Sequence, residues 1–236
     1  MTWVELMGFG PRGWGGAMLA AAGTTLLVAV LGFALGAVFG TLAAAAKLSR
    51  SRVLRVVGDA YTTVLRGVPD LLVVYLLYFG GSAALTAVAR SFGAQGFVGV
   101  PALATGALAL GIVSGAYQAE VYRGAFLAVS RGELEAGRAA GMSGPLMFRR
   151  IIVPQVLRFA VPGLGNVWQL VLKESALISV TGLVELLRMS QIGAGSTREP
   201  FPFYLAAAAL YLVITTVSTA IFARLEARGR RGLVAP

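Results

Sequence analysis

Six polar side chains interrupt otherwise apolar stretches of this chain, and their types are those that bind charged small molecules. A charged side chain in the middle of a bilayer costs at least about 2.5 kcal/mol, so each needs a partner or a polar cavity. The chain has no Cys and no His, which excludes Cys/His metal sites and His-based catalysis. The pattern predicts binding or ion pairing, with no catalytic residue, metal or cofactor. The six residues are Arg66, Asp70, Glu120, Asn166, Lys173 and Glu174.

Two of these residues, Arg66 and Asp70, stand four positions apart, which is one helical turn. Gly67 and Pro69 lie between them and weaken a helix at that point. Broken helices near the middle of a membrane commonly line transport sites. The spacing is equally compatible with an Arg66–Asp70 ion pair that shapes the helix bundle, and both interpretations stay open.

The other four residues also have two interpretations each. Glu120 is three residues before Arg123, which favours a surface ion pair near the membrane boundary. Asn166 belongs to a Pro- and Gly-containing stretch, 162–166, which is expected to unwind locally and free a backbone carbonyl. Lys173 could bind a substrate carboxylate, and Glu174 could bind a substrate cation. The favoured alternative is that the two residues pair with each other or face the water outside the membrane.

The elements that carry these residues are long apolar segments. Only 13% of the 236 residues are charged, about half the share in soluble domains. Five segments have the roughly 20 apolar residues that a helix needs to cross a bilayer. The sequence thus predicts an all-α integral membrane protein forming one transmembrane domain, 1–236. The predicted spans are 16–48, 56–82, 101–129, 156–180 and 203–225.

Basic residues alternate between the loops and predict an orientation. Fourteen of the 20 Lys and Arg residues lie at the C-terminal ends of the first, third and fifth spans or in the segments that follow them, up to the start of the next span. The positive-inside rule therefore predicts a periplasmic N-terminus and a cytoplasmic C-terminus in a bacterial inner membrane, and accounts for the charge without nucleic acid. The fourteen are Lys47, Arg50, Arg52, Arg55, Arg123, Arg131, Arg138, Arg149, Arg150, Arg158, Arg224, Arg228, Arg230 and Arg231; the opposite loops carry Arg12, Arg90, Arg188 and Arg198.

Small residues and one short segment complete the predicted architecture. Gly32, Gly36 and Gly40 repeat every four residues, as do Gly111 and Gly115. This spacing places them on one helix face and predicts closely packed helices. Residues 181–196, between the fourth and fifth spans, resemble an interfacial helix that serves as a gate, a docking ledge or a connector.

A polar stretch in a predicted cytoplasmic loop, GELEAGRAAGMSG (132–144), contains a spaced motif. Glu135-Ala136 is followed by Gly141 six residues after the glutamate, by Ile151, and by Val153-Pro154. This spacing resembles the EAA signature of ATP-binding-cassette (ABC) importer permeases. Gly137 and Val153 depart from it, and the Gly is expected to weaken the helix by about 1 kcal/mol relative to Ala.

Further segments extend the resemblance to nearly the whole chain. TTVLRGVPDLLVVYLLYFGG (62–81), the stretch 120–143, the stretch 148–180 and EPFPFY (199–204) are similar to polar amino-acid permeases. Within that group the chain resembles the Q-type subunits of histidine, lysine–arginine–ornithine and opine importers. The resemblance implies a type I ABC importer (MetI-like) permease fold, with alternating access that moves a polar, basic amino acid from periplasm to cytoplasm.

The same resemblance implies that the stretch 131–150 forms short cytoplasmic coupling helices that dock on an ATPase. The chain has no GxxxxGK[S/T] phosphate loop, so an ATPase would be a separate subunit. The implied partners are two ABC ATPase subunits, a periplasmic substrate-binding protein, and a second permease that is either an M-type relative or a second copy. The implied coupling residues are Glu135, Ala136, Arg138, Gly141, Met142, Phe148 and Pro154.

Two other classes of function fit the sequence less well. An ion-coupled secondary transporter usually has inverted repeats, and none is visible in the five predicted spans. A membrane enzyme would need a reactive cluster of side chains, which a chain without Cys, His or grouped carboxylates does not offer.

Overall fold

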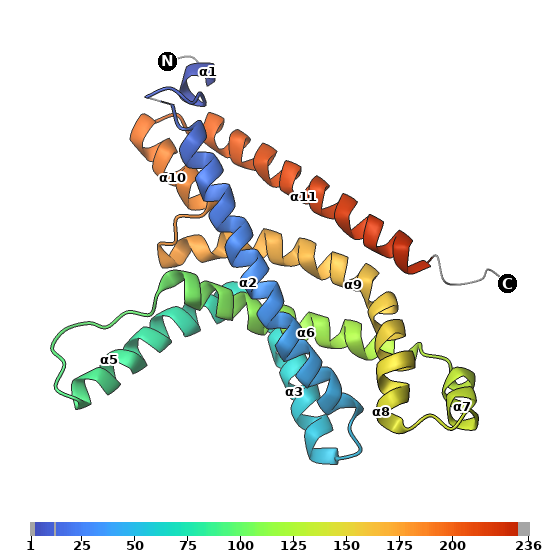
Figure 1. The fold of residues 1–236 in the computed structure, drawn as a ribbon. Coiled ribbons are helices and arrows are strands. Elements are labelled where there is room, and N and C mark those ends of the chain that lie inside the picture. Colours follow the sequence, from blue (N-terminus) through green and yellow to red (C-terminus); the bar gives the residue numbers. More distant parts are fainter. Residues whose placement is uncertain (1–2, 12, 231–236) are drawn as a thin grey trace.

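A computed structural model describes residues 3–11 and 13–230, and within these the chain is helical with no strand (Figure 1). Arg12 and Arg231, which entered the charge count, lie outside the described residues, and so does the side chain of Arg230. The elements are α1 (Trp3–Leu6), α2 (Gly15–Leu48), α3 (Arg52–Gly67), α4 (Asp70–Tyr75), η1 (Leu76–Gly80), α5 (Gly81–Ser91), α6 (Ala102–Leu127), α7 (Arg131–Ala139), α8 (Gly144–Met147), η2 (Phe148–Ile152), α9 (Val153–Glu174), η3 (Ser175–Thr181), α10 (Leu186–Thr197) and α11 (Pro200–Arg230).

Five continuous helical stretches in the described part are long and apolar enough to cross a membrane, as the sequence predicts. Consecutive elements join without a break in two of them: α4, η1 and α5 form one stretch, and α8 to η3 form another. The architecture is therefore an all-α, multi-pass membrane protein. The five stretches are Gly15–Leu48, Asp70–Ser91, Ala102–Leu127, Gly144–Thr181 and Pro200–Gly229.

The second span differs from the predicted range 56–82. The helix breaks at Val68, which is extended with φ −97° and ψ 139°, and a new helix starts after Pro69. A residue before proline is pushed out of the helical region by the proline ring, so the break is local in origin. As a result α3 is a separate amphipathic helix, and the apolar stretch that can span the bilayer begins at Asp70.

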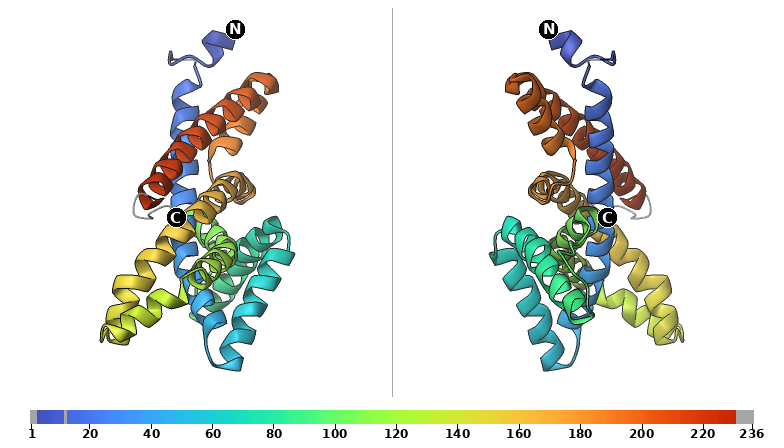
Figure 2. Two further views of the ribbon diagram at one scale, coloured as in Figure 1. Left: turned by 90° about the vertical axis from the view of Figure 1, so that its right-hand side faces the viewer. Right: turned by 90° about the vertical axis from the view of Figure 1, so that its left-hand side faces the viewer.

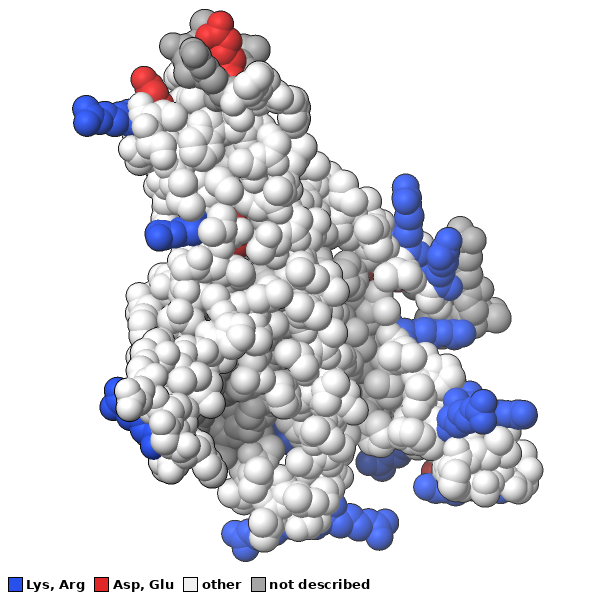
Figure 3. Space-filling view, turned by 60° about the vertical axis from the view of Figure 1, so that its left-hand side comes forward, with Lys and Arg blue, Asp and Glu red and all other residues white. Residues whose placement is uncertain are grey.

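The ends of the long helices gather in two groups. Figure 1 places the N-terminus, α10 and the start of α11 together, whereas α7, α8 and the C-terminal end of α11 lie on the other side. The turn between α2 and α3 also points away from the N-terminus in both views of Figure 2. We call the end formed by the α2–α3 turn, α7–η2 and the C-terminal end of α11 the basic end. Figure 3 shows a broad uncharged surface with most Lys and Arg side chains at its lower and right-hand margins.

Helices α2 and α6 pack against each other so closely that glycine is required at several positions, as the four-residue spacing predicts. A Cβ added to Gly36 would lie 2.2 Å from Oγ of Ser114, and one added to Gly32 would lie 2.5 Å from Cβ of Leu110. On the facing helix, a Cβ at Gly111 would lie 2.6 Å from Cβ of Leu35. This contact forms the centre of the buried core.

Substituting Gly36 by Ala is expected to destabilise the protein by about 1–3 kcal/mol, because an added methyl group overpacks a filled interface. Gly23→Ala, also in α2, is the matched control, since a Cβ there has no atom within 4 Å. Thermal unfolding of the two purified variants in detergent measures the difference. An unchanged unfolding temperature for Gly36→Ala would contradict the close α2–α6 contact.

The expected unwinding of 162–166 does not occur, because α9 continues through Pro162 to Glu174. Its glycines serve close packing: a Cβ at Gly163 would meet Val121 of α6 at 2.8 Å, and one at Gly165 would meet Phe222 of α11 at 3.2 Å. The helix changes character only after Glu174, where η3 continues as a 3-10 helix.

The segment expected to be an interfacial helix forms α10, and its apolar face is covered by protein. Leu186 is fully buried, and α10 packs against α11 and α2. Glu185 caps the helix by accepting hydrogen bonds from the backbone N–H groups of Leu187 and Arg188. Burial raises the pKa of the Glu185 carboxyl above its usual range, while these hydrogen bonds and one from Tyr211 act in the opposite direction.

Candidate functional site

The carboxyl groups of Asp70 and Glu174 lie next to each other in the membrane domain. Asp70 is the first residue of α4 and follows the break at Pro69, whereas Glu174 is the last residue of α9. Glu174 is only 7% exposed, and its Oε2 atom is buried without a hydrogen-bond partner among the described residues. Two carboxylates side by side repel each other and are costly to bury, so the pair favours a bound cation.

Arg66 lies close to this carboxylate pair but does not form an ion pair with Asp70, which was one of the two interpretations of their spacing. The described ion pairs do not include these two residues. The guanidinium of Arg66 instead lies over the ring of Tyr117, 5.3 Å from its centre. Tyr117 is on α6 and is also an electrostatic neighbour of Asp70 and Glu174. The cation–π contact leaves both carboxylates without the internal cation that the spacing suggested.

Lys173 and Asn166, predicted on the same helix, are placed differently from Glu174. Lys173 is exposed and influences Glu174 only through its charge, more weakly than Asp70 does. Asn166 lines a separate groove between α9 and α11, together with Gln169 and Glu226. The structure therefore brings together Arg66, Asp70 and Glu174 but not Asn166.

Glu120 belongs to a second polar cluster, near the basic end. Its Oε2 atom accepts from Arg123, 2.9 Å away, as the three-residue spacing predicts. Its Oε1 atom binds the ammonium of Lys47, which also contacts Asp59 at 3.0 Å and Thr62 at 2.8 Å. Since Lys47 is on α2, Asp59 on α3 and Glu120 on α6, the cluster ties three helices together. All its charges have partners, which indicates a structural role.

The predicted coupling segment forms two short helical parts joined by a bend. α7 ends at Ala139, and Gly141 takes a positive φ of 75°, which only glycine adopts readily. The backbone N–H groups of Gly141 and Met142 donate to the carbonyls of Arg138 and Gly137, which closes the helix end. Ser143 occupies the N-cap position of α8, but its side chain makes no capping hydrogen bond.

Gly137 departs from the EAA signature, and close packing explains why a glycine occupies this position. It is the buried residue of α7, and a Cβ there would lie 2.9 Å from Cδ1 of Ile151 and 3.4 Å from the sulfur of Met147. Glycine lowers the helix propensity of α7 at this position, but it allows α7 to pack closely on α8 and η2. This contact fixes the two parts of the coupling segment relative to each other.

The second part of the coupling segment runs directly into a span. α8, η2 and α9 follow one another without a break, so Phe148 and Pro154 lie on the same continuous helical rod as Glu174. Six of the seven coupling candidates are exposed, and the seventh, Met142, is partly exposed. Glu135 makes no hydrogen bond or ion pair with any other described residue. An exposed surface of this kind is free to contact a partner.

Sequence reasoning missed four residues of these clusters: Tyr117 beside Arg66, and Lys47, Asp59 and Thr62 around Glu120. Tyr117 is an aromatic residue in an apolar span, and no local pattern marks it as a neighbour of Arg66. Lys47 had a usable signal, because it is one of only two lysines in the chain and lies at the end of a span opposite Glu120.

Comparisons with known proteins give a consistent result. Residues 36–231 match a family model described as binding-protein-dependent transport system inner membrane component. The chain is 60% identical to the octopine transport system permease protein OccQ of Rhizobium radiobacter, covering 99% of this chain and 98% of that protein. It is 39% identical to the histidine/lysine/arginine/ornithine transport system permease protein HisQ of Escherichia coli, covering 92% and 94%.

Solved structures agree with the sequence relatives. A crystal structure of an amino acid ABC transporter with histidines has a TM-score of 0.77 and 32% identity, over 91% of this chain and 95% of that one. An inward-facing structure of the MetNI methionine ABC transporter has a TM-score of 0.65 at 17% identity, over 91% and 94%, and supports the fold alone.

Proposed function

Because the chain belongs to the binding-protein-dependent transport system inner membrane components, and is thus a permease subunit of an ABC importer, we propose that it moves a basic amino acid or an opine. The relatives bear the names of octopine, nopaline, histidine and arginine permeases. Most of these names refer to substrates with a cationic group, which two adjacent carboxylates, one buried and one partly buried, would attract. The names of the relatives and the chemistry of the Asp70–Glu174 pair together support this substrate class.

The observation that carries the proposal is the unpartnered Oε2 atom of Glu174 beside Asp70. A buried acceptor without a partner is costly, so the site is most stable when a donor fills it. The guanidinium or ammonium of a basic substrate supplies both the charge and the N–H groups. Arg66, held over Tyr117 at the edge of this site, suits the substrate carboxylate. Uptake of a basic amino acid by the assembled transporter, with and without Glu174→Gln, tests the proposal.

The energy for transport comes from a separate ATPase subunit, as in the related permeases. We place the contact at the coupling segment, on Glu135, Ala136, Arg138, Gly141, Met142, Phe148 and Pro154. A push on α7 and α8 would be transmitted through the continuous α8–η2–α9 rod to Glu174. Since Asp70 lies on a different helix, movement of the rod would change the distance between the two carboxylates. This is a physical route from ATP hydrolysis to substrate release, and hence to alternating access.

The assembly around this subunit includes an ATPase and a soluble substrate-binding protein. We propose two ATPase copies and a second permease of similar fold, either an M-type relative or a second copy of this chain. Large apolar side chains are exposed on α4, η1 and α11, including Leu72, Leu76, Val213 and Val217. Lipid or a second permease subunit would cover this surface. The mass of the purified complex distinguishes a heterodimer from a homodimer.

We also propose that the basic end faces the cytoplasm, because basic residues concentrate in cytoplasmic loops. The chain has no cysteine, so single cysteines report the orientation without background. Ser51 and Ser91 are both exposed, the first in the α2–α3 turn and the second at the end of α5. In spheroplasts, a membrane-impermeant maleimide is expected to label Ser91→Cys, and Ser51→Cys only after lysis. The reverse labelling would overturn the orientation.

A further inference from the structure

Glu185 is a fully buried acid that the proposed transport mechanism does not use. It precedes α10, at the end of the molecule opposite the basic end (Figure 1), and none of its surface is exposed. The described ion pairs do not include it. The guanidinium of Arg188, in the first turn of α10, is exposed and donates to Gln191 instead. Hydrogen bonds, without a cation, therefore stabilise the Glu185 carboxyl group.

The hydrogen bonds of Glu185 extend beyond a helix cap. Its Oε1 atom accepts from the backbone N–H of Arg188 at 2.7 Å, and its Oε2 atom accepts from that of Leu187 at 2.9 Å. These two contacts are the capping bonds of α10. The Oε2 atom also accepts from the hydroxyl of Tyr211 on α11, 3.3 Å away. A cap does not need this third donor, so the contact with Tyr211 ties the start of α10 to another helix.

Two further hydroxyl groups complete a buried polar cluster around Tyr211. Thr25 of α2 and Ser175 of η3 are both fully buried, and both interact with the hydroxyl of Tyr211. Thr25 also accepts from the backbone N–H of Leu186 at 3.0 Å, at the start of α10. We call Thr25, Ser175, Glu185 and Tyr211 the Tyr211 cluster. A buried polar network whose groups have partners is rigid, so this cluster fixes α2, η3, α10 and α11 relative to one another.

The Tyr211 cluster adjoins the carboxylate pair through the chain itself. Ser175 follows Glu174, the last residue of α9, and its Oγ donates to the carbonyl of Leu172 at 2.7 Å. From Ser175 onward the chain continues as a seven-residue 3-10 helix, η3, although runs beyond three or four residues are uncommon because their hydrogen bonds are poorly aligned. The orientation of the end of α9 therefore depends on contacts from other elements. The Tyr211 cluster supplies such contacts one residue after Glu174.

We propose that Tyr211 and Glu185 are positioning residues of the carboxylate site. The Tyr211 cluster holds the end of α9 in the orientation that places the carboxyl group of Glu174 beside Asp70, and a displacement of α10 reaches Glu174 through the same cluster. The effect on uptake rests on the proposed function of the pair, whereas the effect on the geometry of the pair does not, so the two fail separately.

A double-mutant cycle distinguishes positioning from a structural role, because effects that act through one residue do not add. Tyr211→Phe removes only the hydroxyl and is expected to lower uptake of a basic substrate about fivefold, the effect of one hydrogen bond. Combined with Glu174→Gln it is expected to cause no further loss, since the carboxyl group that it positions is then absent. A structural role predicts that the two losses multiply, and that result would overturn the proposal. The matched control is Tyr204→Phe, the same change at an exposed position of α11.

A crosslinking measurement reports the geometry of the pair without transport. The chain has no cysteine, so Asp70→Cys with Glu174→Cys introduces its only two thiols, which a short bis-maleimide joins when they lie side by side. In the purified transporter, adding Tyr211→Phe is expected to lower the rate of this crosslink within the chain by a similar factor. Adding Tyr204→Phe is expected to leave the rate unchanged. Equal rates in the two variants would overturn the proposal, whatever the uptake.

Glu185→Gln is the second variant, for the case in which Tyr211→Phe gives no folded protein. It keeps the shape of the side chain but replaces one acceptor oxygen by an amide group that cannot accept from Tyr211. The same results are expected in the cycle and in the crosslinking. If crosslinking depends on Tyr211 while Glu174→Gln leaves uptake unchanged, the positioning stands and the carboxylate pair is not the substrate site.

Discussion

Glu135→Lys is expected to abolish ATP-driven uptake while leaving the permease folded. Glu135 is exposed on α7 and has no hydrogen bond or ion pair with another described residue, so its replacement removes nothing from the internal packing. If the carboxylate contacts a cation of the ATPase, reversal of its charge costs several kcal/mol at the interface. A loss of more than tenfold is therefore expected in both ATPase recruitment and uptake. Co-purification of the ATPase and uptake into proteoliposomes measure the two effects.

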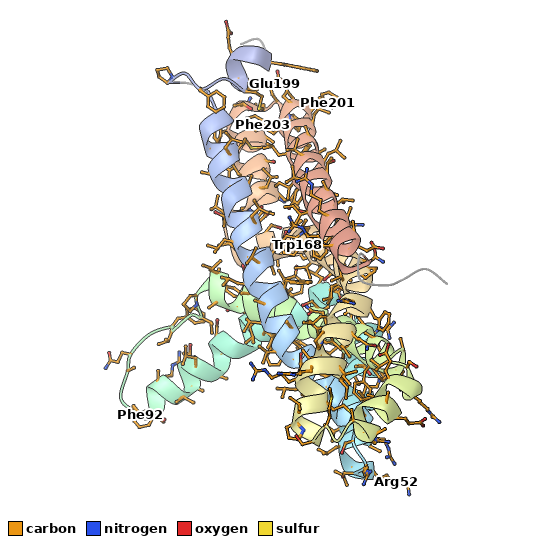
Figure 4. The ribbon with its side chains drawn as sticks, turned by 45° about the vertical axis from the view of Figure 1, so that its right-hand side comes forward. Arg52, Phe92, Trp168, Glu199, Phe201 and Phe203 are labelled. Atoms are coloured by element: carbon orange, nitrogen blue, oxygen red, sulfur yellow. The ribbon has the colours of Figure 1, made fainter. Side chains whose placement is uncertain are left out.

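Glu199→Lys provides the matched control, because this exposed acid makes the same charge change at the opposite end of the molecule (Figure 4). It is expected to retain the ATPase. If Glu135→Lys keeps the ATPase and normal uptake, the assignment of the coupling segment is wrong.

The bend in the coupling segment allows a second, independent test of its role in coupling. Gly141 has a φ of 75°, where a side chain costs about 1–2 kcal/mol, so Gly141→Ala is expected to distort the angle between α7 and α8 and to reduce coupling. Gly132→Ala, within α7, is the control, since a Cβ there meets only Oγ of Ser130 at 3.7 Å. ATP hydrolysis without uptake in Gly141→Ala, and normal coupling in Gly132→Ala, would identify the bend as the element that transmits motion.

Glu174→Gln and Asp70→Asn are expected to reduce uptake of a basic substrate about 30-fold or more. Each change removes one carboxylate from a site in which Glu174 is buried and Asp70 is partly buried, and breaking a buried charge contact with a ligand typically costs roughly 2–5 kcal/mol. Substrate-stimulated ATPase activity of the complete transporter, with its binding protein, measures the loss. The control is Glu199→Gln, which removes the same kind of charge from an exposed position outside the carboxylate pair.

The stability of the Glu174→Gln variant distinguishes a substrate site from a pair of residues with a structural role. Because the carboxyl groups of Asp70 and Glu174 lie side by side without a described cation between them, Glu174→Gln is expected to stabilise the substrate-free protein by about 1 kcal/mol. A structural role predicts the opposite, since a group that holds helices together destabilises the protein when it is removed. Unchanged transport combined with a lower unfolding temperature would therefore refute the site.

The order of elements and the coupling motif could be predicted from the sequence because both are local properties. Hydropathy over about 20 residues defines a span, and five such stretches are present in the described structure. The positive φ of Gly141 and the break before Asp70 are also local, since they follow from glycine and from proline. The pairing of Glu120 with Arg123 needs only the three-residue helical spacing.

Only the tertiary structure decided which helices and side chains contact one another. Four-residue spacing suggested Asp70 as the partner of Arg66, but the helix break turns α4 away from α3, and Asp70 meets Glu174 of α9 instead. The Pro162 stretch suggested unwinding, yet its glycines pack on α6 and α11. Which side chains meet depends on crossing angles and helix breaks that act together over the whole bundle. The sequence therefore determined the spans and the two helical parts of 131–150 with their bend, whereas only the packing of the helices decided that the carboxyl groups of Asp70 and Glu174 lie side by side and that Nε1 of Trp168 has no partner among the described residues.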